Sequence, residues 1–385
     1  MEGRSHQRHT SRPTLAHGSP FAPTPRGSSW QPPTGVDTVP HLTVARVAAE
    51  SLLGTGVYER QVSGRAADAL PDHWTADEVR VRSLRSPLEG THRLPLSRVA
   101  AAPRAVRSIV GRTIYARDAV VHRMSLELPP GPRDIITLHD VVAWKFGDES
   151  APVAAAAEEI RRAAAVICVS EFSAGEAVDL LGIAPPHVIH HGVDTRFIDA
   201  EAATAAQLQD LGITTPFVLT TGGASVRKNL AGLAEAWAVV AEARPELSLV
   251  LTGPPHPRRT SLFAGLPRVV LAGLVDDAVV PGLMAAAEAV VVPSLYEGFG
   301  FPALEGMAAG TLVVAARTSS LPEVVGDGAL LVDPTPDGIA QGIVDATSGD
   351  PATRRLAARG RERASEFTWE RSLRSHAQVW ASVAD

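Results

Sequence analysis

Two glutamates eight residues apart, Glu297 and Glu305, flank a glycine-rich turn in the second half of the chain. Residues 289–292 before the turn form a short β-branched run, which is typical of a buried parallel strand. Pro302 suits the first turn of a helix and a glycine suits the position just past its end, so residues 303–309 are predicted to be helical. The N-terminus of this helix would present free N–H groups to an anion beside the turn. Both carboxylates could then face a ligand that lies across the turn and accept hydrogen bonds from its hydroxyl groups.

A second group, Arg227-Lys228-Asn229, stands out from the composition of the chain. Of 36 lysines and arginines only Lys145 and Lys228 are lysine, and Asn229 is the only asparagine. Such a bias is typical of a GC-rich genome that exchanges both residue types wherever it can, so their retention side by side favours a functional requirement, with chance as the alternative. Both cations precede a predicted helix over residues 230–243, where they oppose the helix dipole, which makes a purely structural role unfavourable. There they can hold a diphosphate, the arginine by paired hydrogen bonds and the lysine as a point charge.

A third group of polar residues ends a predicted strand in the first half of the chain. The pattern of residues 135–140 predicts an apolar strand that ends in His139 and Asp140. A histidine and an acid at the carboxyl edge of a parallel sheet lie where ligands bind in open α/β folds. A structural histidine–aspartate pair is the alternative interpretation. His122 ends the predicted strand over residues 119–123 and is interpreted as an internal structural histidine.

The segment Ser-Leu-Tyr-Glu-Gly-Phe-Gly-Phe-Pro-Ala-Leu-Glu, which contains both glutamates, closely resembles the E-x7-E element of retaining glycosyltransferases with the GT-B fold, in particular glycosyltransferase family 4. Two bare glutamates at this spacing are usually solvated charges, and it is the residues around them that favour the family. The resemblance implies that Glu297 lies at the donor sugar as a catalytic residue and that Glu305 holds the ribose hydroxyls of the nucleotide. It also implies that three loop amides contact the sugar and the phosphate: Gly298, Phe299 and Gly300.

Other segments resemble further motifs of the same family. The resemblance implies that His139 contacts the donor sugar as a second catalytic residue, and that Asp140 either orients the histidine or meets an acceptor hydroxyl. The loop Gly-Thr-Gly-Val-Tyr, which contains Gly56 and leads into a predicted helix over residues 59–70, would lie at the cleft near the donor phosphates and the acceptor. The segment His-Gly-Val-Asp that starts at His191 resembles the hinge that closes the first domain. The family commonly has asparagine at that position, and the histidine is given little functional weight.

A second phosphate cradle is implied by the loop over residues 222–226, which contains Gly223. Lys228 matches a phosphate-binding lysine of the family. Many relatives place another arginine six positions before this lysine, where the chain has Gly222. Arg227 must then supply the second positive charge.

The resemblance implies an α/β protein with the GT-B fold, in which two Rossmann-like domains face each other across a cleft. Residues 1–38 are rich in Pro, Ser, Gly, His and Arg without an apolar period and are predicted to be a disordered extension. An N-terminal acceptor domain is expected over residues 39–198 and a C-terminal nucleotide-sugar domain over residues 210–368. A final helix, residues 369–385, is expected to return to the N-terminal domain.

The implied reaction is transfer of a sugar, with retention of anomeric configuration, from a nucleotide-sugar donor to a hydroxyl of a glycan, glycolipid or small-molecule acceptor. GDP-mannose is the first candidate donor, because the loops around Lys228 and Glu297 resemble those of mannosyl and related transferases of polysaccharide assembly. No metal or other cofactor is expected, since Arg227, Lys228 and helix N-termini can stabilise the departing diphosphate. Asp276-Asp277 is interpreted as a turn and helix cap rather than a metal-binding motif.

Three alternatives share parts of this pattern. A GT-B sugar-nucleotide epimerase would use the same fold and ribose contacts without an acceptor. A catalytically silent nucleotide-sugar-binding protein would also keep the fold, but here the four residues His139, Lys228, Glu297 and Glu305 are all intact. A pyridoxal-phosphate phosphorylase would need a Schiff-base lysine, and neither lysine has that setting.

Composition narrows the remaining classes of function and location. The net charge of −6 disfavours a nucleic-acid partner. The single cysteine, Cys168, excludes a disulfide framework. No run approaches the ~18 apolar residues of a membrane span and no hydrophobic signal core is present, so a cytoplasmic location is expected. The basic segment over residues 96–113 is interpreted as a surface helix, and the resemblance leaves open its peripheral contact with an anionic membrane. Its cations are Arg98, Arg104, Arg107 and Arg112.

Overall fold

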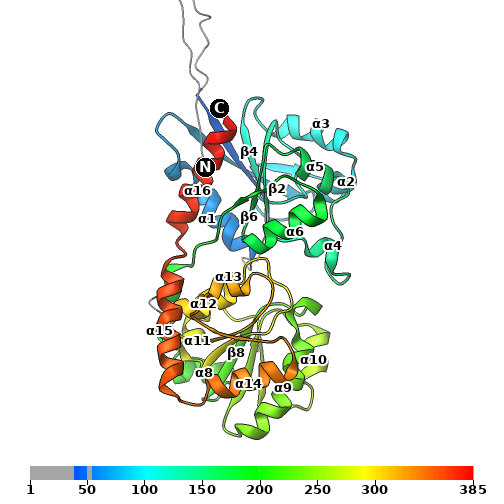
Figure 1. Ribbon diagram of the computed structural model, residues 1–385. Helices are drawn as coiled ribbons and strands as arrows, with labels where there is room; N and C mark the ends of the chain where they lie inside the picture. The colour runs from blue at the N-terminus through cyan, green and yellow to red at the C-terminus, as the bar shows by residue number, and fades with distance from the viewer. Residues whose placement is uncertain (1–38, 50–53, 199, 385) are drawn as a thin grey trace, which may run out of the picture. The chain divides into compact units, whose positions relative to one another are not determined.

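The computed structural model describes residues 39–49, 54–198 and 200–384. The predicted extension over residues 1–38 lies outside the described residues. The described part contains two parallel β-sheets, each flanked by helices (Figure 1). The predicted α/β class with two Rossmann-like halves is therefore confirmed.

The first sheet has seven parallel strands in the order β3-β2-β1-β4-β5-β6-β7. Its order reverses at β1, the point at which open α/β sheets bind ligands beyond the carboxyl ends of their strands. The elements of this half are, in chain order, β1 (His41–Val47), α1 (Thr55–Ala69), β2 (Thr75–Ser83), β3 (His92–Leu94), α2 (Leu96–Ala101), α3 (Arg104–Ile114), β4 (Val120–Arg123), β5 (Arg133–Leu138), α4 (Val142–Lys145), α5 (Ala156–Arg162), β6 (Ala165–Cys168), α6 (Glu171–Leu181) and β7 (His187–Val188).

Local turns set where two helices of this half begin. Helix α1 begins at Thr55 instead of residue 59, because Gly54, with φ at 57°, turns the chain directly into the helix. The segment after Pro152 becomes helical only at Ala156, since the chain first makes a turn closed by a hydrogen bond from the amide of Ala156 to the carbonyl of Val153 at 2.9 Å.

The basic segment over residues 96–113 forms two short helices, α2 and α3, and its predicted position on the surface is wrong for Arg107. The guanidinium of Arg107 is fully buried and donates from Nε and Nη2 to the two carboxylate oxygens of Glu159, at 2.6 and 3.1 Å. A buried arginine needs such a partner, and this one lies 52 residues away in the sequence. On the outer face of α3, Val106 and Ile109 are exposed instead.

The second sheet has six parallel strands in the order β10-β9-β8-β11-β12-β13. Helix α12 (Phe301–Ala308) lies directly on these strands at Gly306, because a Cβ at this position would come within 3.1 Å of Val290 and Val313. The elements of this half are α7 (Thr195–Ile198), α8 (Ala205–Asp210), β8 (Phe217–Thr221), the 3₁₀ turn η1 (Val226–Lys228), α9 (Leu230–Ala243), β9 (Ser248–Thr252), α10 (Pro257–Phe263), β10 (Val269–Gly273), α11 (Val280–Ala286), β11 (Ala289–Val292), α12 (Phe301–Ala308), β12 (Val313–Ala316), α13 (Leu321–Val325), β13 (Leu330–Val332) and α14 (Pro336–Ala346).

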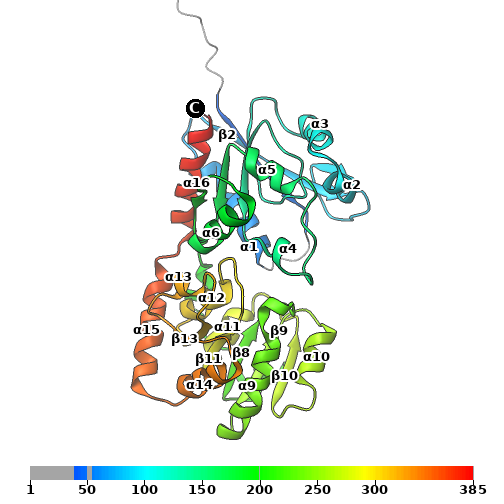
Figure 2. The ribbon, with the colours of Figure 1, turned by 45° about the vertical axis from the view of Figure 1, so that its right-hand side comes forward.

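The last two helices, α15 (Pro351–Ser365) and α16 (Trp369–Ala384), belong to different halves. Helix α15 packs on α12 and α13, whereas α16 packs on α1, β4 and β5 of the first half (Figures 1 and 2). The fully buried Trp380 donates from its indole nitrogen to Nδ1 of His122 at 3.2 Å, and Nε2 of the histidine is 2.7 Å from Oγ1 of Thr137. The predicted return of the final helix to the first half and the structural interpretation of His122 are both confirmed.

Candidate functional site

A cavity of about 490 Å³ is lined by residues that follow the carboxyl ends of strands in both sheets. Gly56 does not line it, although the neighbouring Thr55 and Val57 do, because α1 begins early and Gly56 is its second residue. All the other residues predicted for the site line this cavity: His139, Gly223, Arg227, Lys228, Glu297, Gly298, Phe299, Gly300 and Glu305.

Glu297 follows β11 at the start of the glycine turn, and its side chain is almost completely buried. Its Oε1 accepts hydrogen bonds from Nζ of Lys228 and Oγ of Ser294, both at 2.7 Å, and its Oε2 lies 3.3 Å from Nη1 of Arg227. Burial alone would raise the pKa of Glu297, but Lys228 and Arg227 outweigh burial and hold it below its usual value. Glu297 is therefore an anion at neutral pH.

Glu305 lies in the second turn of α12, at the other end of the same glycine turn. Its carboxylate has no hydrogen-bond or ion-pair partner among the described residues, and it lines the cavity. Burial raises the pKa of Glu305 to about 7; Asp277 raises it further and Arg196 opposes the rise. The two glutamates thus differ. The negative charge of Glu297 is balanced by two cations, whereas the carboxylate of Glu305 remains available to accept hydrogen bonds from a ligand.

Arg227 and Lys228 lie on the short turn η1, directly before α9. Asn229 then adopts the left-handed conformation, with φ at 53°, and donates from Nδ2 to the carbonyls of Pro293 and Pro334 at 3.0 and 2.9 Å. These bonds fix the turn that carries both cations and give the single asparagine of the chain a structural reason. Nε of Arg227 also donates to Glu149 at 2.8 Å, so this arginine is shared between two carboxylates.

His139 follows β5 on the side of the cavity formed by the first sheet. Burial lowers the pKa of His139 to about 4, and His376 acts in the same direction, so the imidazole is neutral at physiological pH. Its Nε2 is buried and has no hydrogen-bond partner within the described ranges. Oδ1 of Asp140 accepts from the amide of Val142 at 3.1 Å, and in the described part of the chain it makes no bond to His139. An orienting role for Asp140 is thus not supported, and a contact with an acceptor remains a prediction.

The glycine turn is tied to the first sheet through Gly298. A Cβ at Gly298 would lie 2.3 Å from the carbonyl oxygen of His139, so only glycine fits there. The carbonyl of Gly298 accepts hydrogen bonds from the hydroxyls of Ser170 and Ser173, at 2.6 and 2.9 Å. Ser170 also caps α6 by accepting from the amide of Ser173. The glycine turn is therefore held in place by residues that follow β5 and β6 of the first sheet.

His191, given little functional weight from the sequence, is buried in the wall of the cavity. Its ring stacks on Phe301, with 4.8 Å between ring centroids and 5° between planes, and lies 4.8 Å from Phe299. The sequence signal that could have identified it was its position in the hinge motif. Other cavity residues carry no motif that links them to the site, and only the fold brings them there: Thr221, Thr252, Leu274, Val275 and Asp277.

Two general features of the described residues bear on function. No group of three or more His, Cys, Asp or Glu side chains among them is arranged to hold a metal ion. Asp276, predicted to form a turn and helix cap, forms the turn, in which its Oδ1 accepts from the amide of Ala278 at 2.9 Å, but the predicted cap is wrong because the N-cap of α11 is Val279. None of the helices in the described ranges is both long enough and apolar enough to span a bilayer.

Two family models match separate parts of the chain. Residues 49–197 match Glycosyltransferase Family 4 and residues 215–348 match Glycosyl transferases group 1. Among curated proteins, the O-antigen chain mannosyltransferase B of Escherichia coli is 32% identical over 226 residues, which cover 55% of this chain and 59% of that protein. The GDP-mannose-dependent α-(1-6)-phosphatidylinositol dimannoside mannosyltransferase of Mycobacterium tuberculosis is 31% identical over 223 residues, 57% of this chain and 58% of that protein. The chain thus matches little more than half the length of these relatives.

Solved structures extend the similarity to almost the whole described fold. A sucrose-phosphate synthase from Thermosynechococcus elongatus superposes with a TM-score of 0.71 at 22% identity, covering 89% of this chain and 98% of that one. The Anabaena protein HepE, in complex with UDP and glucose, gives a TM-score of 0.69 at 19% identity, covering 89% and 99%. These likenesses show the GT-B fold. Since the two family models together span well over half of the sequence and agree with this fold, the chain belongs to glycosyltransferase family 4, the glycosyl transferases group 1.

Proposed function

We propose that this protein is a retaining glycosyltransferase, which moves a sugar from a nucleotide-sugar donor to a hydroxyl group of an acceptor. The observation that carries the proposal is the pair of unlike glutamates on the glycine turn. Glu297 is an anion paired with Lys228, and Glu305 is unpaired and faces the same cavity. A site that must hold a diphosphate, a sugar and a ribose needs cations at one end and a hydrogen-bond acceptor at the other.

Each of these residues then has a distinct task in the transfer. Lys228 and Arg227 stabilise the negative charge that develops on the departing diphosphate. Glu305 accepts hydrogen bonds from the ribose hydroxyls, and Glu297 positions the donor and stabilises positive charge at the anomeric carbon. The neutral imidazole of His139 can hydrogen-bond a hydroxyl of the donor sugar without adding a charge. Since cations and backbone amides carry the electrostatic stabilisation, we propose that the reaction needs no metal.

GDP-mannose is the donor that we propose. The M. tuberculosis relative is named as GDP-mannose-dependent, and the E. coli relative is named as a mannosyltransferase. The acceptor that we propose is a hydroxyl of a glycan or of a lipid-linked glycan. The UDP and glucose complex of HepE supports the fold only, because the two chains are 19% identical.

The test is turnover by the purified protein with GDP-mannose, UDP-glucose and UDP-galactose, each with and without a panel of mannosides. We expect GDP release and a new disaccharide with GDP-mannose, an α linkage in the NMR spectrum of the product, and unchanged rates in EDTA. The Glu297→Gln variant should lose most activity, whereas the exposed Glu288→Gln should keep it. A changed sugar on the nucleotide without any acceptor would identify an epimerase, and binding without turnover a silent protein.

We further propose a peripheral contact with anionic membrane through the outer face of residues 96–113. Arg107 is buried and takes no part, but Arg98 and Arg112 are exposed, as are Val106 and Ile109 on α3. Exposed apolar and basic side chains on short surface helices are the elements of interfacial binding. Co-sedimentation with phosphatidylglycerol vesicles should be lost in Ile109→Asp and absent with phosphatidylcholine; equal recovery with both lipids would contradict the contact.

A further inference from the structure

Three arginines of the described chain are buried, and they differ in what balances their charge. Arg107 is paired with Glu159, and Arg123 is paired with Glu159 and Asp134. Arg259 is 4% exposed and has no carboxylate partner in the described ranges. Buried charges in proteins are normally paired or bind an ion. Arg259 is therefore a buried cation whose counter-ion has to be identified.

Arg259 lies on α10, and its guanidinium reaches the carboxyl ends of β8 and β9. Nη1 donates to the carbonyl of Pro254 at 2.9 Å and Nη2 donates to the carbonyl of Gly222, while Nε is buried without any partner among the described residues. Two of its five N–H groups are thus used, both by neutral acceptors. Burial also lowers the pKa of Arg259, and no acid among the described residues offsets that effect.

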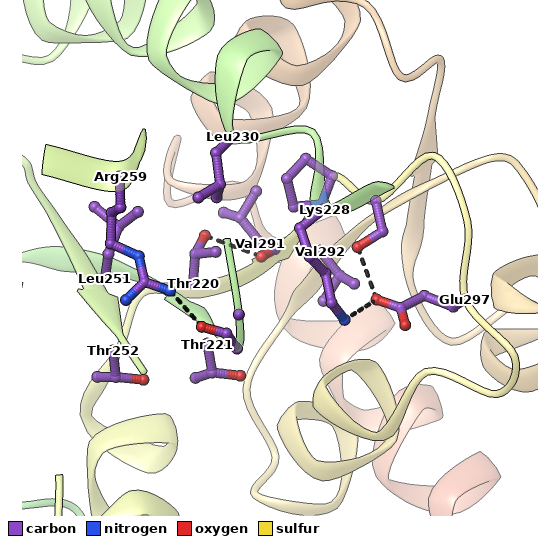
Figure 3. A pocket seen from close by; sticks show the side chains of 14 residues that line it. Thr220, Thr221, Lys228, Leu230, Leu251, Thr252, Arg259, Val291, Val292 and Glu297 are labelled. Carbon is purple, nitrogen blue, oxygen red and sulfur yellow. Dashed lines mark hydrogen bonds and ion pairs between the residues drawn. The ribbon is translucent and has the colours of Figure 1, made fainter. Parts of the chain in front are cut away.

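The guanidinium shares a pocket with the ammonium group of Lys228. Both side chains line a small pocket together with Gly222, Gly223 and Thr252, which also line the large cavity, so the small pocket adjoins it. Figure 3 shows Lys228 and Arg259 approaching from opposite sides of the strand end that carries Thr220 and Thr221. An anion placed above the turn formed by Gly222 and Gly223 would have one cation on each side.

The backbone of Gly222 explains why a charge at this place has to come from elsewhere in the chain. Its φ of 123° is a conformation that side-chain-bearing residues rarely adopt, and it directs the carbonyl to Arg259. Arg227, which precedes Lys228, is already shared between Glu149 and Glu297. Arg259 is the cation beside this turn that has no carboxylate partner in the described part of the chain.

We infer that Arg259 is a diphosphate-binding residue of the donor site, acting beside Lys228 from beneath the turn formed by Gly222 and Gly223. The inference rests on the proposed function, because the anion is the diphosphate of the nucleotide sugar. The guanidinium contributes positive charge in a water-poor setting and holds the carbonyl of Gly222, so that the amides of the turn face the ligand. A purely structural role, in which Arg259 only joins two loops, makes a different prediction.

The experiment separates charge from structure by comparing ligands with and without phosphate. Calorimetric titrations would use GDP, guanosine, UDP, uridine and inorganic pyrophosphate against the full chain, Arg259→Met and Arg259→Lys. The Met variant keeps an unbranched apolar stem without the charge, and the Lys variant keeps the charge. Arg258→Gln is the matched control, since Arg258 is the preceding residue, is partly exposed, and lies with its Nη1 3.4 Å from Oδ2 of Asp148.

We expect Arg259→Met to weaken nucleoside diphosphate and pyrophosphate binding by roughly 10- to 100-fold, the usual range for a lost hydrogen bond to a charged group. The affinity for nucleosides should stay within about twofold of the parent. Arg259→Lys should recover most of the diphosphate affinity, and Arg258→Gln should bind like the parent. Equal losses for nucleoside and diphosphate, or none for either, would overturn the inference.

If the Met variant does not fold, the ¹⁵N spectrum of the unaltered protein still tests the inference. The Nε–H signal of Arg259 in the ¹⁵N spectrum, assigned by its absence in the Lys variant, should shift with GDP or pyrophosphate and not with guanosine. An unchanged signal at saturation would refute the role of Arg259. If the parent binds neither GDP nor UDP, it is the proposed function that fails.

Discussion

Replacing Lys228 tests whether the donor site needs a compact ammonium group or only a positive charge. Its Nζ lies 2.7 Å from Oε1 of Glu297, and a Cβ built on Gly222 would be 3.9 Å from the same Nζ. The ammonium is therefore bounded by the carboxylate of Glu297 on one side and by the turn at Gly222 on the other. A guanidinium is longer, planar and forked, so it cannot occupy this space without moving the turn or the diphosphate.

The expected magnitudes follow from these distances. In Lys228→Arg a misplacement on the scale of an ångström costs on the order of 100-fold in kcat. In Lys228→Ala the departing diphosphate loses one stabilising charge, which costs roughly 100- to 1,000-fold in kcat. The alanine variant also leaves Glu297 with the more distant Arg227, so burial is less well opposed and the pKa of Glu297 rises. The acid limb of its pH–rate profile should then move to higher pH.

Steady-state kinetics with the donor at saturation measure both effects. The matched control is Lys145→Arg, because Lys145 is the other lysine of the chain and forms a half-exposed pair with Glu176. That variant should differ from the parent by less than about twofold, since exposed ion pairs contribute little. If Lys228→Arg turned over within a few-fold of the parent, the argument from the shape of the site would be refuted, and with it the inference drawn from the composition.

Three further perturbations have expected outcomes that the structure sets. Glu305→Ala should raise KM for the donor more than it lowers kcat, because ribose hydrogen bonds exist in the ground and transition states alike; a fall in kcat at unchanged donor affinity would contradict the ribose assignment. The pKa of Glu305 is raised to about 7, and hydroxyl donors favour its charged form, so nucleotide-sugar affinity should increase as pH rises from about 6 to 8 and then level off, and Glu305→Gln should remove this dependence in calorimetric titrations. Glu159→Gln leaves Arg107 and Arg123 with one carboxylate between them and should lower the free energy of unfolding by about 3–5 kcal/mol. The adjacent Glu158→Gln, which breaks only an exposed pair with Arg162, should lower it by less than about 0.5 kcal/mol in urea titrations, and equal losses would show that burial does not decide the cost.

The sequence alone located the elements that carry the chemistry. A β-branched run identified the buried strand at residues 289–292, and the structure has this strand with those bounds. Proline and glycine placed α12 after the glycine turn to within two residues of its observed start. These signals succeed because strand burial, helix starts and tight turns depend on residues that are neighbours in the chain.

Contacts between distant residues were decided by the tertiary structure. The motifs put Glu297 and Lys228 in one site, but no pattern gave the hydrogen bond between residues 69 apart that sets the charge of the glutamate. Arg107, which looked like a surface cation, is buried because the fold brings Glu159 to it. Arg259 likewise carries no local signal for its position beside the cavity. The physical reason is that burial and pairing depend on which strands become neighbours, and removal from water then determines whether a charge must find a partner, a ligand or a proton.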